Sequence, residues 1–193
     1  MILKDSLLTL LKEKQMAAIT VKELCELADV NRSTFYAHYL DLYDLLAQIE
    51  DELIEELNMY LSTYNFTKEK EALQMTEKLL EYLATRQDEC KTLLNENSDS
   101  SFQKKVEDVA HQFIMKNWMA VNRLDQNFSE YLSAFIVSGS IQMMKMWINN
   151  GMDKSPKEMA EIINNIINKG LWGVKWRENG EVGNIHVRQP IIF

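Results

Sequence analysis

The sequence contains few residues that interrupt helices. All six glycines and both prolines lie at or beyond Gly139, so the first 138 residues contain neither. That stretch is rich in Leu, Glu, Lys and Ala, which favour helices. The alternation expected of a strand is not convincing before the C-terminal tail. The sequence therefore predicts an all-α fold in which polar capping residues separate the helices.

Cysteines and long apolar runs are also scarce. The two cysteines, Cys25 and Cys90, cannot form a disulfide framework and are interpreted as small buried hydrophobes in a reducing compartment. No apolar run approaches the roughly 18 residues needed to cross a bilayer. The N-terminus has no signal-peptide pattern. We therefore expect a cytoplasmic protein with no membrane partner.

Patterns typical of an enzyme or a metal centre are missing as well. The three histidines, His38, His111 and His186, are scattered, and neither cysteine has another cysteine nearby. There is no Gly-rich phosphate loop and no Ser, His and Asp order that suggests a triad. We expect no enzymatic activity, no metal and no cofactor.

The charge of the chain does not favour a nucleic-acid partner. The 193 residues carry a formal net charge of -8. The first 48 residues carry five Lys or Arg against seven Asp or Glu, a net of -2. Any DNA binding must therefore depend on local geometry rather than on bulk charge.

Three N-terminal segments begin with the same capping pattern. An apolar residue precedes a capping side chain, and a second apolar residue follows four places later, as in a hydrophobic staple. The caps are Thr20, Asn31 and Asp41, and Glu23 completes a capping box with Thr20. The staple pairs are Ile19 with Leu24, Val30 with Phe35, and Leu40 with Leu45.

The helices that begin at Thr20 and Asn31 are short and need support from a neighbour. Helix starts at positions 20, 31 and 41 leave only about two turns for each, which is too few for independent stability. The preceding helix offers an apolar stripe at helical spacing, and a tight turn is expected at Asp29 and Val30. Two short helices joined by such a turn are typical of a helix-turn-helix. The stripe consists of Leu3, Leu7, Leu10 and Leu11.

The segment from Asn31 to Tyr39, NRSTFYAHY, carries many hydrogen-bonding groups for a helix surface. Phe35 and Tyr39 are one turn apart and should face the neighbouring helices, which leaves hydroxyls, a phenol and Ala37 outside. Hydroxyl groups can bind phosphates or base edges, Arg can bind guanine, and Ala can meet a thymine methyl. For His38, a partly buried imidazole with a structural hydrogen bond is favoured over base contact.

This N-terminal segment resembles the DNA-binding domain of the tetracycline-repressor (TetR) family of bacterial transcription regulators. Three positions depart from that pattern: the usual turn glycine is Asp29, a frequent Lys is Leu42, and no basic arm precedes the first helix. The matching positions, within about residues 2 to 48, are Thr20, Val30, Thr34, Phe35, Tyr36, His38 and Tyr39. The resemblance implies an operator DNA partner, contacted through Thr20, Lys22, Asn31, Arg32, Ser33, Thr34, Tyr36, Ala37, His38 and Tyr43.

The remainder of the chain is predicted to hold a larger helical domain. We expect residues 1–48 to form the DNA-binding domain, residues 49–176 an effector-binding and dimerisation domain, and residues 177–193 a tail without an assigned role. The tail is either a hairpin around Asn179 or a loosely attached extension. Helices should begin near Thr67, at Ser100 or Ser101, and near Asn127. The last of these should stop at Gly151, and a further helix should begin with a capping box at Ser155, Pro156 and Glu158.

The last two helices carry more apolar surface than one side of a monomer core requires. Pairing them across a two-fold axis would form a four-helix bundle, and similar regulators dimerise in this way. We therefore expect a homodimer. The expected interface residues are Met144, Ile148, Met159, Ile162, Ile163, Ile166 and Ile167.

Methionines and aromatic residues of the larger domain could line an adaptable pocket. Packing of the core and the dimer seam is the alternative for most of them. The resemblance implies a small apolar effector, whereas regulators akin to dihydroxyacetone-kinase operon activators answer to a partner protein. Both alternatives stay open. The candidate pocket residues are Phe113, Met115, Trp118, Met119, Tyr131, Phe135, Met143 and Trp147.

The predicted function is sequence-specific DNA binding by a transcriptional repressor that an effector releases. One alternative is an interaction protein or co-activator whose helix-turn-helix no longer reads DNA. A second alternative is a small-molecule carrier without an operator.

Overall fold

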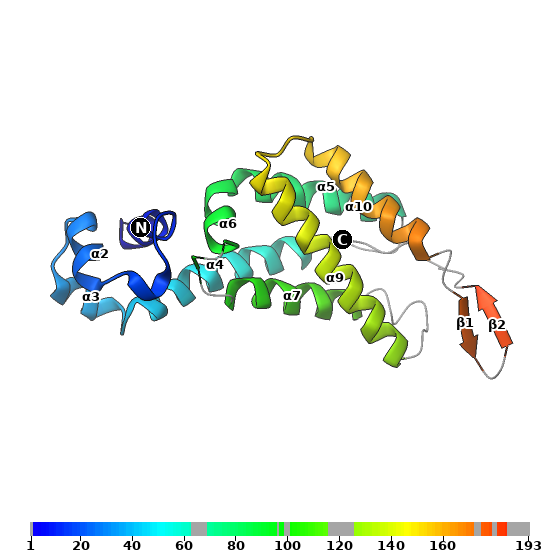
Figure 1. Cartoon of the computed structure of the whole chain (residues 1–193), viewed down its shortest axis with the longest axis horizontal. Helices are drawn as coiled ribbons and strands as arrows, with labels where there is room; N and C mark the ends of the chain where they lie inside the picture. The colour runs from blue at the N-terminus through cyan, green and yellow to red at the C-terminus, as the bar shows by residue number, and fades with distance from the viewer. Residues whose placement is uncertain are drawn as a thin grey trace. The chain divides into compact units, whose positions relative to one another are not determined.

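In the residues that its computed structural model describes, the chain is helical apart from one short hairpin (Figure 1), which confirms the predicted all-α fold. The structure describes residues 2–62, 69–95, 97–98, 101–115, 126–171, 175–178 and 181–184. The chain divides into two compact units, each made of two segments. Unit 1 comprises Met1–Met59 and Arg86–Val106, and unit 2 comprises Tyr60–Thr85 and Glu107–Phe193.

Unit 1 is built around the predicted apolar stripe of the first helix. Leu7 and Leu11 are fully buried, and they share one core with Leu24, Phe35 and Leu45, which are also 0% exposed. This core supplies the support that the two short helices need. The elements are α1 (Ile2–Leu11), η1 (Met16–Ala18), α2 (Val21–Ala28), α3 (Arg32–His38), α4 (Leu42–Ser62), α6 (Gln87–Leu93) and α7 (Ser101–Ile114); α4 and α7 both continue into unit 2.

The predicted helix starts in unit 1 are confirmed, although the caps differ in detail. The Thr20 hydroxyl accepts a hydrogen bond from the Glu23 N–H at 3.2 Å, and the Asp41 carboxylate accepts one from the Asp44 N–H at 2.8 Å. Asn31 precedes α3 without a side-chain cap bond. The Glu23 carboxylate accepts a hydrogen bond from Lys14 rather than completing the expected capping box.

One of the three predicted staples is wrong. Ile19 and Leu24 are buried as expected, but Leu40 is 85% exposed and does not pack on Leu45. The entry into α4 is fixed instead by a hydrogen bond from the Leu40 N–H to the Asp44 carboxylate at 2.9 Å. A polar bond therefore replaces the apolar contact at this helix start.

A helix break at Arg86, which the sequence analysis did not anticipate, separates α5 (Glu69–Thr85) from α6. Arg86 leaves helical geometry, with φ −112° and ψ 26°. Its guanidinium forms a bidentate pair with Glu56 at 2.9 and 3.0 Å and also bonds Glu89 at 3.0 Å. These contacts fix the break without a glycine or a proline.

In unit 2, α9 (Gln126–Asn149) and α10 (Pro156–Leu171) are joined by a tight corner, and α10 packs along α5 (Figure 1). Gly151 has φ 74°, in the left-handed region that glycine tolerates, so the predicted stop of α9 is confirmed. The Trp147 indole N–H donates to the Lys154 carbonyl at 2.9 Å. This bond ties the end of α9 to the start of α10.

The capping box at the start of α10 is confirmed in both directions. The Glu158 N–H donates to the Ser155 hydroxyl at 3.2 Å, and the Ser155 N–H donates to the Glu158 carboxylate at 2.9 Å. The hydrogen bonds from Ser155 lower the pKa of the Glu158 carboxyl.

The hairpin alternative for the tail is also confirmed. Strands β1 (Lys175–Glu178) and β2 (Glu181–Asn184) pair antiparallel, with Glu178 opposite Glu181.

Across the described residues, none of the helices combines the length and the hydropathy that a membrane crossing requires.

Candidate nucleic-acid interface

A left-handed turn at Asp29 sets the direction of α3. Asp29 has φ 53° and ψ 44°, and its backbone N–H donates to the Cys25 carbonyl at the end of α2. The Val30 N–H donates to the same carbonyl at 3.0 Å. Because Asp can adopt this conformation at modest cost, the turn forms without the glycine usual at this place. The short turn places α3 directly after α2, as in a helix-turn-helix.

Phe35 anchors α3 to the core of unit 1. Its side chain is 0% exposed, and its ring lies 5.2 Å from the ring of Tyr36 and 5.6 Å from that of Tyr39. The Tyr36 ring meets Phe35 at 83°, an edge-to-face geometry that aromatic pairs favour. Tyr36 is nevertheless 59% exposed, so its phenol is available outside the core.

All ten residues predicted to contact DNA are exposed. They lie at the start of α2, along α3 and at the start of α4, within one compact unit. Phe35 is the one fully buried residue of α3. The exposed residues are Thr20, Lys22, Asn31, Arg32, Ser33, Thr34, Tyr36, Ala37, His38 and Tyr43.

The expected partial burial of His38 is wrong. Its side chain is exposed, and its ring lies 6.3 Å from that of Tyr39 in a tilted arrangement. His38 is the last residue of α3, and its neighbour Tyr39, rather than His38, packs against the core that holds Phe35. The imidazole therefore belongs to the outer surface together with the hydroxyl groups.

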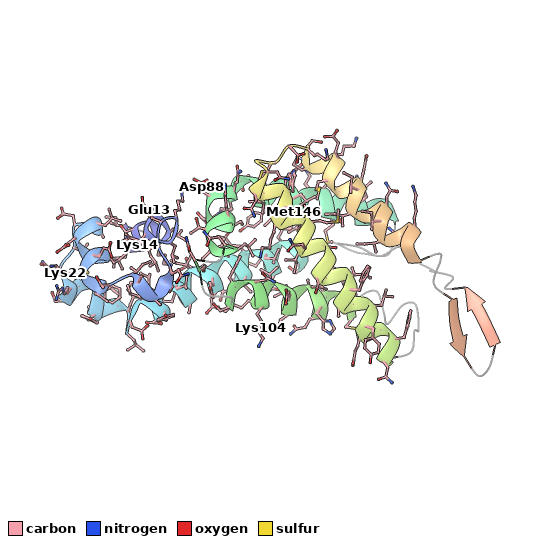
Figure 2. All side chains as sticks on the ribbon, viewed as in Figure 1. Glu13, Lys14, Lys22, Asp88, Lys104 and Met146 are labelled. Carbon is pink, nitrogen blue, oxygen red and sulfur yellow. The ribbon has the colours of Figure 1, made fainter. Side chains whose placement is uncertain are left out.

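Most cations of the N-terminal segment are paired with carboxylates. The pairs are Lys4 with Glu52, Lys12 with Asp88, Lys14 with Glu23, and Lys22 with Glu26. Among the described residues, Arg32 is the remaining Lys or Arg of the first 48 and has no ion pair. Lys22, labelled in Figure 2, is exposed and lies 3.7 Å from Glu26. The surface around α3 therefore has little free positive charge.

An open groove of about 460 Å³ lies where α2 meets α3. Two cations, Lys22 and Arg32, share its lining with two carboxylates, Glu26 and Asp29. Cys25 also lines it; burial raises the pKa of the Cys25 thiol, and the charge of Arg32 offsets this in part. The groove is thus nearly neutral at the edge of the predicted DNA-contact surface.

The residues predicted for an effector pocket are not brought together as expected. Tyr131 and Phe135 are 79% and 76% exposed on α9, so they do not line an interior pocket. Trp147 is buried, but its N–H is used in the corner between α9 and α10. Phe113, Met115 and Met143 are half-buried, and Trp118 and Met119 lie outside the described residues.

Most residues predicted for the dimer interface are core residues of the single chain. Only Ile166, which is 55% exposed, and the half-buried Ile162 are accessible. The helices have apolar residues on two faces, and the sequence does not distinguish the inner face from the outer one. The buried residues are Met144, Ile148, Met159, Ile163 and Ile167.

Sequence reasoning missed the outward apolar face of α9. Tyr131 and Phe135 share this face with Met146, which is 55% exposed and labelled in Figure 2. Ala134 and Ser138 add small side chains between them and are also exposed. Their spacing of three, four and eleven to fifteen residues places them on one side of a helix, which was the available signal.

Comparison with known proteins identifies the family. Residues 70–169, just over half of the chain, match the family model of a TetR-type transcriptional regulator C-terminal region. YxbF of Bacillus subtilis (strain 168), an uncharacterised helix-turn-helix-type transcriptional regulator, is 22% identical over 167 residues. The match covers 82% of this chain but only 42% of YxbF, so the chain spans about two fifths of that relative.

Two solved structures show the same fold. A TetR transcriptional regulator from Streptococcus agalactiae 2603V is 21% identical with a TM-score of 0.61, covering 86% of this chain and 91% of that chain. The dihydroxyacetone kinase operon activator DhaS is 15% identical with a TM-score of 0.58, covering 88% and 93%. With the family match over residues 70–169, the chain belongs to the TetR family, whose members are transcriptional regulators rather than enzymes.

Proposed function

We propose that this chain is a homodimeric, sequence-specific DNA-binding regulator in which α3 enters the major groove. The observation that carries the proposal is the division of α3 into two sides. Phe35 is fully buried, whereas Ser33, Thr34 and Tyr36 are exposed. A helix held by one ring, with a flank of hydroxyls and a phenol, can lie against base edges without losing its anchor. Such a regulator would act in the cytoplasm, as the sequence predicts.

The roles of the contact residues follow from their places on the helices. The Arg32 guanidinium can form two hydrogen bonds with guanine or one phosphate, and Ala37 lets the backbone come close to a thymine methyl. Residues at the starts of α2 and α4 suit the flanking phosphates. We assign phosphate contacts to Thr20, Lys22, Arg32 and Tyr43, and groove contacts to Asn31, Ser33, Thr34, Tyr36, Ala37 and His38.

Dimerisation is assigned to the outward apolar face of α9, with the exposed Ile166 of α10 as a second candidate contact. Tyr131 and Phe135 are large apolar side chains that a monomer leaves in water. A two-fold axis would place this face against its own copy. The two helix-turn-helix units of one dimer (the reading heads) each have little free positive charge. Joined in a dimer they would bind DNA more tightly than singly, because binding by one raises the effective concentration of the other. Heads that read successive major grooves should lie ~34–36 Å apart.

The proposed effector acts on the spacing of the two heads. It can change DNA affinity only through its preference for one spacing over another. A small apolar molecule that releases a repressor fits the expectation from the sequence. The fold shared with DhaS, which is named an activator, keeps a response to a partner protein as the second possibility.

Binding to the DNA upstream of the chain's own gene tests the DNA proposal. We expect a mobility shift whose affinity falls as salt rises, because phosphate contacts release counterions. The double variant Thr34→Ala, Tyr36→Ala should lose this binding while remaining dimeric. Thr9→Ala is the matched control, since Thr9 is also an exposed helical threonine but lies on α1. Unchanged binding by the double variant would refute the assigned contact face.

The rival function, an interaction protein without DNA readout, predicts no shift even at low salt.

The dimer face has its own test. Phe135→Asp should give a monomer by light scattering, because a carboxylate would be buried at the seam. Leu40→Asp is the control, since Leu40 is 85% exposed in unit 1. A Phe135→Asp protein that stays dimeric would place the interface elsewhere.

A further inference from the structure

The core of unit 1 includes a segment that lies far from the helix-turn-helix in the sequence. Residues 86–106, which contain α6 and the first half of α7, belong to the same compact unit as α1, α2 and α3. Leu93 is 1% exposed and Phe102 is 5% exposed, and both are part of the cluster that buries Phe35. A later part of the chain therefore contributes to the core on which the recognition helix is anchored.

Two hydrogen bonds of Asn97 attach the same segment to the end of α1 and to η1. The Met16 N–H donates to the Asn97 carbonyl at 2.9 Å, and the Asn97 side-chain amide donates to the Leu11 carbonyl at 3.3 Å. Leu11 is the last residue of α1, so its carbonyl has no partner within the helix. Asn97 thus bonds both α1 and the turn that leads to α2.

Glu50 joins α4 to the start of α7 within unit 1. Its side chain is only 1% exposed, and its carboxylate accepts hydrogen bonds from the Ser101 hydroxyl at 2.8 and 3.1 Å. Lys105 lies 3.0 Å from the same carboxylate and 2.6 Å from Asp51. A buried carboxylate is costly unless it is paired and hydrogen-bonded, so both partners must stay in place.

The charge state of Lys105 fits this arrangement. Burial by itself lowers the pKa of the Lys105 ammonium, but hydrogen bonds to Asp51 and Glu50 outweigh burial and leave that pKa above its usual value. Lys105 therefore stays charged across the neutral range. The start of α7 is held on α4 by the Lys105 ammonium, which pairs with Glu50 and Asp51, and by the Ser101 hydroxyl, which donates to Glu50.

We propose that residues 86–106 are an obligatory part of the compact unit that carries the DNA-contact surface, which we call the reading unit. Glu50 is the positioning residue that holds α7 on α4. Displacement of α7 then reaches α3 through the shared core, because Leu45 and Leu46 of α4 lie in the cluster around Phe35. The consequence for DNA binding depends on the function proposed above, whereas the cooperative unit itself does not. In this arrangement a regulatory signal has a physical route to the recognition helix.

Hydrogen exchange on the full chain tests the inference without DNA. Glu50→Gln removes the buried charge at constant size, and Glu55→Gln makes the same change at an exposed carboxylate of the same helix. For Glu50→Gln we expect exchange to accelerate by about tenfold or more in residues 86–106 and in α1 to α3, because they open as one unit. Exchange in α10 should not change. Glu55→Gln should have little effect anywhere.

Each other result overturns the proposal. Acceleration confined to the start of α7 would show that the segment is not part of the reading unit. Equal acceleration in α10 would show a general structural role, and no change would show that Glu50 positions nothing. If Glu50→Gln does not fold, Ser101→Ala removes one partner of the same carboxylate and should give the same pattern at smaller size.

Operator binding gives a separate readout. Glu50→Gln should bind the upstream DNA at least about tenfold more weakly than Glu55→Gln, with the dimer intact. Equal affinity of the two variants would contradict the positioning role. If the unaltered chain binds no DNA, the proposed function fails, while the exchange pattern still decides whether residues 86–106 belong to the reading unit.

Discussion

Replacing Arg32 with Gln should make DNA binding much less sensitive to salt. Lys4, Lys12, Lys14 and Lys22 are each paired with a carboxylate, whereas Arg32 has no ion pair among the described residues. A paired lysine must exchange its carboxylate for a phosphate, so its net gain on binding DNA is small. Arg32 can contact the DNA directly. Its guanidinium should therefore be the main source of counterion release.

The size of the effect follows from the number of contacts. Each phosphate contact contributes about 0.9 to the slope of log affinity against log salt concentration. A dimer carries two copies of Arg32, so Arg32→Gln should reduce the slope by about 1.8. Relative to a reference at about 1 M salt, this is a loss of roughly 60-fold in affinity at about 0.1 M.

Removing a carboxylate should have the opposite effect. Glu26 lies 3.7 Å from Lys22 and lines the groove that also contains Arg32. Glu26→Gln should therefore free Lys22 for a phosphate and steepen the slope, by at most about 1.8 per dimer. Because both groups are exposed and their pairing is weak, the gain should be smaller than the loss from Arg32→Gln.

Fluorescence anisotropy with labelled upstream DNA over a salt series measures all of these slopes. Glu81→Gln is the matched control for Glu26→Gln: it changes the net charge equally, but Glu81 pairs with Lys78 on α5, in unit 2. It should leave the slope unchanged. An Arg32→Gln dimer with the slope of the unaltered chain would refute the argument, since the salt dependence would then arise elsewhere.

Three further predictions concern stability and reactivity. Ser155→Ala should lower the free energy of unfolding by about 1 kcal/mol in urea titrations, because both directions of the capping box are lost. Asp29→Gly should raise the melting temperature, since glycine tolerates φ 53° better than Asp does; a lower melting temperature would contradict this. The Cys90 thiol should resist thiol reagents at pH 8 until the chain unfolds, because burial, followed by the Glu89 charge, raises its pKa to about 12. This raised pKa also means that the stability from Cys90 is complete below about pH 9 and declines by about 1.4 kcal/mol per pH unit from there to about pH 12.

The helix-turn-helix could be predicted from the sequence because its determinants are local. Thr20, Asn31 and Asp41 mark three helix starts, and the buried Phe35 follows directly from helical spacing. Cap side chains and apolar periodicity act within one or two turns of chain, so the printed order of residues contains them. Because these local signals agree with the fold, the DNA-contact face could be predicted from the sequence.

The break at Arg86 could not be predicted, because its determinants are distant. The guanidinium is held by Glu56, which lies 30 residues earlier, and no glycine or proline marks the place. The pairing of Lys12 with Asp88 has the same character. Counting charged residues in the sequence likewise gave the net charge of the first 48 residues. It could not show which lysines are already paired with carboxylates.

The assignments on α9 failed for a related reason, and the failure itself supports a second copy of the chain. Ile136 and Val137 are buried on one side of α9, while Tyr131 and Phe135 are exposed on the other, so apolar periodicity cannot tell the core from a seam. Burying a side chain of that size contributes about 1.5–3 kcal/mol, and a two-fold interface would bury the rings of both copies. Rings that were expected to line an effector pocket thus supply the strongest physical reason for this chain to dimerise through α9.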